Sequence, residues 1–200
     1  MSNVICHIAM SLDGYAAGPN QSLENPLGEG GMRLHDWAFG GGTDADKEVR
    51  ELITRGFGAY IMGRNMFGGG DGAWDASWQG WWGEDPPYHA PVYVLTHHER
   101  EPLEMQGGTT FHFVTGGVGS ALGQARAAAG DADVAIAGGP STVQQYLAAG
   151  LLDELYLHIA PILLGAGERL LEHCGDLKLE PVETIGTRAC THVRYRVVND

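Results

Sequence analysis

Short apolar runs that end in glycine or polar residues recur along this chain and predict a series of strands. They lie at residues 4–10, 59–62, 91–95, 111–114, 134–137 and 151–160. The run at 134–137 is apolar throughout and a glycine pair follows it, which is typical of a strand buried on both faces of a sheet. This stretch is the one around which we expect the other elements to be organised.

Apolar residues at helical spacing separate several of these strands. A capping sequence at residues 43–46 predicts a helix that runs to about Arg55, with Val49, Leu52 and Ile53 as its buried stripe. A second helix is predicted from about Ser120 to Ala129, a third after Pro140, and a short one after Gly63.

The C-terminal part of the chain has a different pattern. Residues 177–185 and 190–198 predict two strands joined through Gly186 and Thr187, and the alternation at 191–197 suits an antiparallel pair with one solvated face. Because the earlier strands alternate with helices, we predict a three-layer α/β fold with a mostly parallel central sheet and an antiparallel C-terminal edge. We expect residues 1–200 to form one domain.

Three predicted strands end in residues suited to binding an anionic ligand. The ends carry Gly63-Arg64, Thr96-His97-His98 and Gly138-Gly139. Ligands gather at the carboxyl ends of parallel strands, and the free N–H groups of a helix's first turn attract a phosphate. Each feature alone is also compatible with an ordinary tight turn. Their recurrence at several strand ends favours a binding site.

Two acids and a tryptophan-rich segment are further candidates for function. Asp36 lies among aromatic residues, where desolvation can let a carboxyl hold a proton, although such a residue more often caps a helix. Asp13 follows the first strand and can either cap a turn or contact substrate. Residues 68–91 contain tryptophans at 74, 78, 81 and 82, which could line a pocket, form a subunit contact or hold the loop on the core.

Composition excludes several classes of function. The net charge of −13 argues against a nucleic-acid-binding surface, and no apolar run approaches the roughly 20 residues needed to span a bilayer. The N-terminal residues lack the basic segment of a secretion signal, so we expect a cytoplasmic protein. Cys6, Cys174 and Cys190 lack metal-ligand spacing, which predicts no metal site and reduced thiols in the core.

The order of these motifs resembles the dihydrofolate reductase superfamily. The motifs are Ser-Leu-Asp-Gly after the first strand, Met62-Gly63-Arg64, Leu95-Thr96 and Ile136-Ala137-Gly138-Gly139. The segment Pro161-Ile162-Leu163-Leu164-Gly165 is similar to the branch that contains the reductase domain of bacterial riboflavin biosynthesis, the deaminase-reductase C-terminal domain.

This resemblance implies an NADPH-dependent reductase of a pyrimidine or pterin-like molecule, similar to 5-amino-6-(5-phosphoribosylamino)uracil reductase, and a homodimer. It places Gly63 and Arg64 at the cofactor's phosphates, and the residues from Thr96 to His98 near its adenosine 2′-phosphate. It assigns the pyrophosphate and nicotinamide side to Gly138, Gly139, Pro140, Ser141 and Thr142, with a cis peptide between the two glycines.

The resemblance also places Asp36 near the family's substrate-binding acid, so Asp36 is our candidate catalytic residue and Asp13 the reserve. Two alternatives stay open. One is a non-catalytic nucleotide-binding protein that keeps the fold. The other is a Rossmann-type enzyme built on Gly117, Gly119 and Gly123, although the third glycine is misplaced for that fingerprint.

Overall fold

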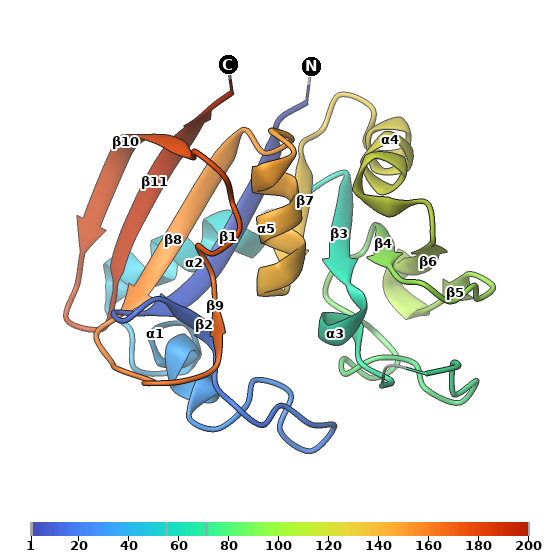
Figure 1. Cartoon of the computed structure of the whole chain (residues 1–200), viewed down its shortest axis with the longest axis horizontal. Helices are drawn as coiled ribbons and strands as arrows, with labels where there is room; N and C mark the ends of the chain where they lie inside the picture. The colour runs from blue at the N-terminus through green and yellow to red at the C-terminus, as the bar shows by residue number, and fades with distance from the viewer. Residues whose placement is uncertain (1, 55, 71, 200) are drawn as a thin grey trace.

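The computed structural model describes residues 2–54, 56–70 and 72–199, and its centre is a nine-stranded sheet (Figure 1). The strand order is β10-β11-β8-β1-β7-β3-β4-β6-β5. The strands are β1 (Val4–Ser11), β3 (Ala59–Gly63), β4 (Pro91–Leu95), β5 (Leu103–Glu104), β6 (Thr110–Val114), β7 (Val134–Gly138), β8 (Glu154–Ala160), β10 (Lys178–Gly186) and β11 (Thr191–Val198).

The pairing of these strands confirms a mostly parallel sheet with an antiparallel C-terminal edge. Strands β8, β1, β7, β3, β4 and β6 pair in parallel, whereas β11 runs antiparallel to β8 and pairs with β10. A second antiparallel edge, formed by β5 against β6, was not predicted. Two further short strands, β2 (Tyr15–Ala17) and β9 (Glu168–Arg169), form a separate antiparallel pair. Elements of two or three residues are too short to give a recognisable periodicity.

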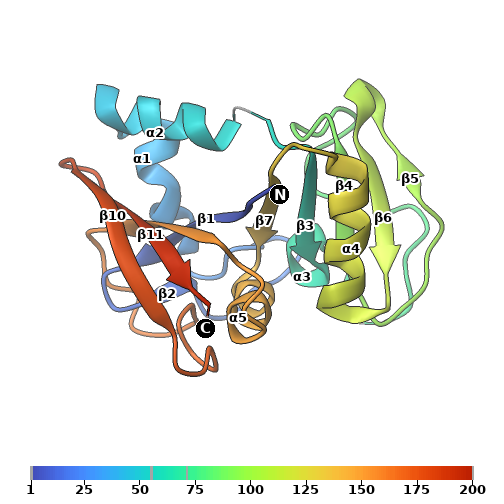
Figure 2. The same ribbon diagram turned by 90° about the horizontal axis from the view of Figure 1, so that it is seen from above.

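Helices cover both faces of the sheet (Figure 2). Helices α4 (Gly117–Ala129) and α5 (Pro140–Ala148) pack on one face with the main core cluster, which includes Val4, Ile136 and Tyr146. Helix α1 (Asp36–Phe39), preceded by the 3₁₀ turn η1 (Gly31–His35), and helix α2 (Asp44–Thr54) lie on the other face. The remaining helices are α3 (Arg64–Phe67) and η2 (Gln106–Gly108).

The helix predictions need three adjustments. Helix α4 begins at Gly117 rather than near Ser120, because the glycines that suggested a loop take part in the first turn. Helix α2 is described to Thr54, and Arg55 lies outside the described residues. Of the predicted stripe, Val49 is buried but Leu52 is 40% exposed, because α2 packs on the sheet mainly through Val49 and Ile53.

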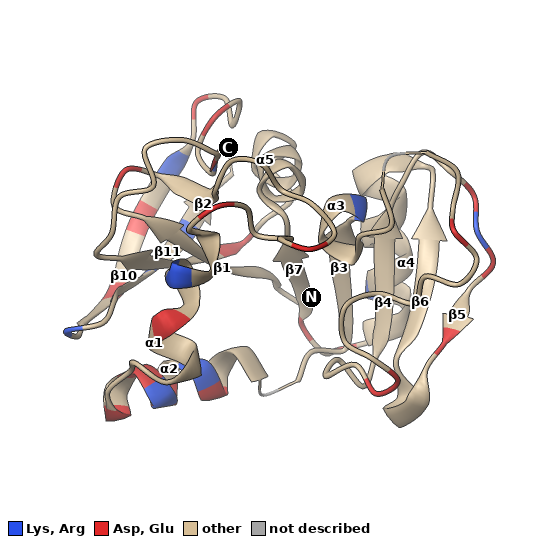
Figure 3. Cartoon of the chain, turned by 90° about the horizontal axis from the view of Figure 1, so that it is seen from below, with Lys and Arg blue, Asp and Glu red and all other residues tan. Residues whose placement is uncertain are grey.

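The three cysteines are buried and unbonded, which agrees with the prediction of core thiols. Burial raises the pKa of Cys190 to about 12 and also raises the pKa values of Cys6 and Cys174. No helix within the described part of the chain is both long enough and apolar enough to cross a membrane. Acidic and basic residues lie side by side on α2 and along the loop after β4 (Figure 3).

Candidate active site

A cavity of about 630 Å³ opens where β1 and β7 separate. The two strands pair only from Val4 with Val134 to Cys6 with Ile136, while β7 continues alongside β3 as far as Gly138. The residues that follow on each strand, among them His7 and Ala137, line the cavity. The site therefore lies between neighbouring strands at their carboxyl ends, the usual place for a ligand in an open α/β sheet.

The structure brings together all of the residues that were predicted to bind cofactor. The cavity is lined by Gly63, Arg64, Thr96, His97, His98, Gly138, Gly139, Pro140, Ser141 and Thr142. These residues come from the ends of three strands and from the first turns of α3 and α5. Their convergence arises because parallel strands place their carboxyl ends at one edge of the sheet.

Glycines lie at the ends of β3 and β7, and one of them is required by the close approach of α5. A Cβ atom at Gly63 would collide with Oγ1 of Thr142, a side chain that is itself buried. At Gly139 a Cβ would meet nothing within 4 Å. The peptide between Gly138 and Gly139 is cis, as the resemblance implied. Glycine at these positions keeps the backbone of the strand tip accessible from the cavity.

Helices α4 and α5 both begin at the cavity. Gly117 at the start of α4 and Ser141 in the first turn of α5 line it, and neither helix has a side-chain cap. The N–H groups of Thr142 and Val143 bond to the carbonyl of Gly139. The first turns supply partial positive charge, and the Thr115 and Ser141 hydroxyls add neutral donors, whereas the Thr96 hydroxyl donates to the His98 carbonyl.

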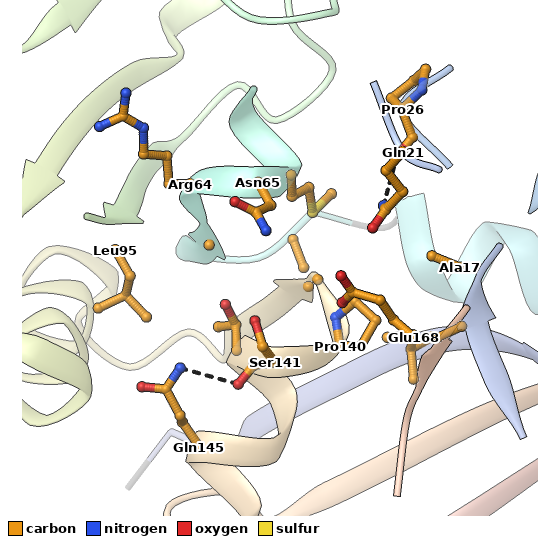
Figure 4. Close-up of a pocket in the computed structure, with 18 of the residues that line it drawn as sticks. Ala17, Gln21, Pro26, Arg64, Asn65, Leu95, Pro140, Ser141, Gln145 and Glu168 are labelled. Carbon is orange, nitrogen blue, oxygen red and sulfur yellow. Dashed lines mark hydrogen bonds between the residues drawn. The ribbon is translucent and has the colours of Figure 1, made fainter. Parts of the chain in front are cut away.

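Arg64 lines the cavity but its guanidinium is directed away from Ser141 and Pro140 (Figure 4). It donates to the carbonyl of Gly72 at 2.6 Å, and its Cζ lies 3.7 Å from the centre of the Trp74 ring. Asn65, the next residue, lies between Arg64 and α5. The tryptophan-rich loop therefore holds Arg64 at the rim of the cavity.

The tryptophan-rich loop has two of the roles considered from the sequence. Trp74, Trp78 and Trp82 pack against the core cluster around Phe67, and Trp78 Nε1 donates to the Phe67 carbonyl at 3.0 Å. Trp81 and Trp82 line the cavity. The loop is both anchored to the core and part of the site wall, and Asp71 within it lies outside the described residues.

The two acids predicted as catalytic are not among the residues that line the cavity. Asp36 is exposed in the first turn of α1, whereas its neighbour His35 lines the cavity. Asp13 accepts hydrogen bonds from the Ser11 hydroxyl and from the N–H groups of Leu164 and Gly165. The Ser11 bond, helped by the two backbone bonds, lowers the pKa of Asp13 to about 2 against a smaller effect of burial. In this geometry Asp13 anchors a loop, and neither acid faces the cavity.

Sequence reasoning missed two of the histidines that line the cavity. His7 lies in β1 and His35 ends η1, and both line the cavity. His35 Nδ1 is buried and has no hydrogen-bond partner within the described residues, and burial lowers the pKa of His35 despite the nearby Asp36. A histidine inside an otherwise apolar strand was the available signal, but the register that brings it to the site is a tertiary property.

The family model described as the RibD C-terminal domain matches residues 2–191. The chain belongs to the RibD C-terminal domain family. Membership of this reductase-domain family implies oxidoreductase activity. A comparison with curated proteins found no match.

Solved structures with low sequence identity show that the fold is dihydrofolate reductase-like, as predicted. A candidate riboflavin biosynthesis protein from Shewanella sp. PV-4 is 24% identical with a TM-score of 0.68, covering 98% of this chain and 99% of its own. A pyrimidine reductase-like protein from Corynebacterium diphtheriae is 16% identical with a TM-score of 0.60, covering 100% and 93%. Dihydrofolate reductase from Enterococcus faecalis, complexed with NADP(H), is 13% identical with a TM-score of 0.56, covering 98% and 97%.

Proposed function

We propose that this member of the RibD C-terminal domain family is an NADPH-dependent reductase of a small pyrimidine-like heterocycle. The observation that supports the proposal is the convergence of three strand ends and two helix N-termini on one cavity. The proposed substrate class is that of 5-amino-6-(5-phosphoribosylamino)uracil, since the family and its neighbours include reductases of pyrimidine type.

The residues present fit a dinucleotide. Gly139 leaves open space where a side chain would otherwise project, and the first turn of α4 offers N–H donors to phosphates. In α5 the donor that is left is the Ser141 N–H, because Pro140 has no N–H and those of Thr142 and Val143 bond to the Gly139 carbonyl. Thr115 and Ser141 add hydroxyl donors, and the exposed His97 and His98 belong to the same lining. A bound nicotinamide cofactor would supply the hydride, while the protein would position the substrate and provide a proton.

Cationic side chains contribute little to this cavity. Among the described residues that line it, Arg64 is the one Lys or Arg, and the tryptophan-rich loop already engages its guanidinium. We therefore assign phosphate binding mainly to backbone N–H groups and hydroxyls, with His97 and His98 nearest the predicted 2′-phosphate position.

One observation favours the alternative of a nucleotide-binding protein without catalysis. Asp36 and Asp13, the acids predicted to act on substrate, lie outside the cavity lining. This alternative predicts NADPH binding without turnover, whereas the reductase hypothesis predicts both.

The test combines binding and turnover on the purified chain. NADPH should change the intrinsic tryptophan fluorescence, because Trp81 and Trp82 line the cavity. Absorbance of the reduced nicotinamide should then fall when 5-amino-6-(5-phosphoribosylamino)uracil or a related pyrimidine is added. Binding without oxidation for every pyrimidine tried would favour the non-catalytic alternative, and absence of binding would contradict both.

The family resemblance also leads us to propose a cytoplasmic homodimer that acts on small molecules. Light scattering of the purified protein checks the assembly directly. A monomer at micromolar concentration would contradict it.

A further inference from the structure

A line of buried polar side chains runs from the cavity wall to helix α2. His7 Nδ1 lies 3.4 Å from His158 Nε2, His158 Nδ1 lies 2.9 Å from His192 Nδ1, and His192 Nε2 lies 2.9 Å from Asp46 Oδ1. His158 is 2% exposed, His192 5% and Asp46 0%. We name these four residues the histidine chain.

The fold builds the histidine chain from three neighbouring strands. His192 on β11 is the register partner of His158 on β8, and His158 is the partner of Ala9, two residues after His7 on β1. Side chains two residues apart on a strand share a face, so the three imidazoles lie in one row under α1 and α2. Trp37 of α1 closes the row from above, with ring centres 4.7 Å from His158 and from His192.

Asp46 fixes the direction of every hydrogen bond in the histidine chain. Its Oδ2 accepts from the backbone N–H and the hydroxyl of Thr43, both at 2.6 Å, and its Oδ1 accepts from Thr187 and His192. Burial acts to raise the pKa of Asp46, but these hydrogen bonds outweigh it and lower that pKa to about 2. Asp46 is therefore a carboxylate and an acceptor only.

The tautomers follow from this anchor. In neutral His192 the proton lies on Nε2, which donates to Asp46, and Nδ1 is left as an acceptor. His158 must then donate from Nδ1 and accept at Nε2, and burial together with the neighbouring histidines lowers its pKa so that it stays neutral. His7 must in turn donate from Nδ1 to His158.

We propose that His7 is the proton donor of the cavity and that Asp46 sets its tautomer through His192 and His158. This proposal rests on the proposed reductase function. His7 lines the cavity, and its Nε2 points away from His158 because the two ring nitrogens lie on opposite sides of the imidazole. His158, His192 and Asp46 are positioning residues that do not reach the cavity lining.

The proposed step transfers one proton from His7 to the substrate. With a reduced nicotinamide as the hydride donor, the imidazolium of His7 gives its Nε2 proton to a basic atom of the substrate. The Nε2–H bond breaks, its electron pair stays on Nε2, and the proton bonds to the substrate. The product is neutral His7 with its proton on Nδ1, the tautomer that the histidine chain favours, and His7 is protonated again from solvent through the cavity.

The titratable and charged groups around His7 come from several elements. Tyr156 of β8 stacks on His7 with ring centres 4.1 Å apart, and Arg194 of β11 lies over the Tyr156 ring, 5.8 Å from its centre. The described titratable and charged groups that line the same cavity are His35 of η1, Arg64 of α3, His97 and His98 after β4, and Glu168 of β9. His158, His192 and Asp46 lie behind His7, away from the cavity lining. No three His, Cys, Asp or Glu residues of the described chain are placed to hold a metal ion, so the row is not a metal site.

Asp46→Asn is the decisive substitution because it should reverse the donor–acceptor direction of every hydrogen bond between the three histidines. The backbone N–H of Thr43 can only donate, so the amide oxygen of the new side chain must face Thr43. Its NH₂ group then faces His192 Nε2, which must become an acceptor. The same reversal passes through His158, so neutral His7 should move its proton from Nδ1 to Nε2. Asp44→Asn is the matched control, because Asp44 lies on the same helix turn but is exposed and pairs with Lys47, at 2.7 Å, rather than with a histidine.

The first measurement needs no cofactor. Nitrogen-15 NMR of the histidine rings, with the His7 signals assigned by their loss in His7→Gln, reads the tautomers in the apo protein. We expect an Nδ1 proton on neutral His7 in the wild type and in Asp44→Asn, and an Nε2 proton in Asp46→Asn. A wild-type His7 that carries its proton on Nε2 would overturn the proposal even if Asp46→Asn did not fold.

The second measurement is the pH dependence of turnover. His7→Gln should lower kcat by about 100-fold or more, the usual contribution of a positioned acid, with NADPH affinity unchanged. Asp46→Asn should move the alkaline limb of the kcat/KM profile down by about one pH unit, since protonated His7 would then face an N–H of His158. Wild-type turnover in His7→Gln, or loss of the limb in His35→Gln instead, would overturn the role of His7. Failure of the wild type to bind NADPH would overturn the proposed reductase function itself. The NMR experiment needs no NADPH, so it tests the His7 tautomer independently of that function.

Discussion

Replacing Gly63 with alanine should push apart two elements that form the wall of the cavity. The backbone of Gly63 has φ −81° and ψ 158°, which any residue can adopt, so the added methyl group is the main perturbation. That methyl would fall on Thr142 Oγ1, while the Thr142 Cβ at 3.6 Å and the Gly138 carbonyl oxygen at 3.9 Å are ordinary contacts. One atom therefore accounts for the clash.

The size of the effect follows from this local overpacking. Forcing an extra methyl group into a packed region costs typically about 1–3 kcal/mol. Each kcal/mol lowers the melting temperature of a chain of this size by roughly 2–4 °C. Because Oγ1 of Thr142 is the clashing atom, Thr142→Ala should restore most of the loss in the double variant, with a coupling energy of about 0.5–3 kcal/mol.

Urea unfolding of the two single variants and the double variant measures this coupling, and NADPH titration of the same proteins links it to the site. Gly119→Ala is the matched control, because a Cβ there meets nothing within 4 Å, and it should keep both stability and NADPH binding. Wild-type stability in Gly63→Ala, or a double variant no more stable than Gly63→Ala, would refute the reasoning. Loss of NADPH binding in Gly119→Ala alone would instead favour the Rossmann-type alternative.

Three further predictions concern the cavity wall, the loop after β8 and the core. Replacing Trp81 and Trp82 by phenylalanine should remove most of the NADPH-dependent fluorescence change, whereas Trp78→Phe should keep it, because Trp78 does not line the cavity. The opposite pattern would place the ligand elsewhere. Asp13→Asn should destabilise the protein most above pH 3.8, and the difference in unfolding free energy from wild type should shrink as the pH falls toward about 2, because the hydrogen bonds that lower the pKa of Asp13 favour its charged form. Urea unfolding across this range checks the trend, and a pH-independent difference would contradict it. Burial and raised pKa values should make Cys6, Cys174 and Cys190 react slowly with a thiol reagent in the folded protein and quickly in denaturant. Rapid labelling of the folded protein would argue against a buried position for the labelled thiol.

The apolar runs predicted the central sheet well because each buried strand has a strong local signal. Residues 59–62, 91–95 and 134–137 all became strands within a residue or two of the expected bounds. The C-terminal hairpin was also predicted from the alternation in 191–197. The expected solvated face of β11 was wrong at His192, which is 5% exposed because Trp37 of α1 packs on it. The short strands β2, β5 and β9 were missed because their pairing depends on distant segments rather than on local pattern.

The candidate site also contains some residues that local sequence could predict and others that it could not. Glycines at strand ends could be recognised, because close approach of backbone segments needs residues without a side chain. The position of Asp36 relative to the cavity could not be predicted from the sequence. A shift of one residue along η1 and α1 decides whether His35 or Asp36 faces the cavity. The histidine chain was also invisible in the sequence, because its members lie at residues 7, 46, 158 and 192 and meet only through strand register.

A crystal structure of the protein grown with NADPH tests the central claim most directly. We expect one dinucleotide per chain, with its phosphates at the first turns of α4 and α5 and its nicotinamide beside Gly139, in the cavity between β1 and β7. A cofactor bound at another surface, or a cavity that stays empty at saturating NADPH, would contradict it.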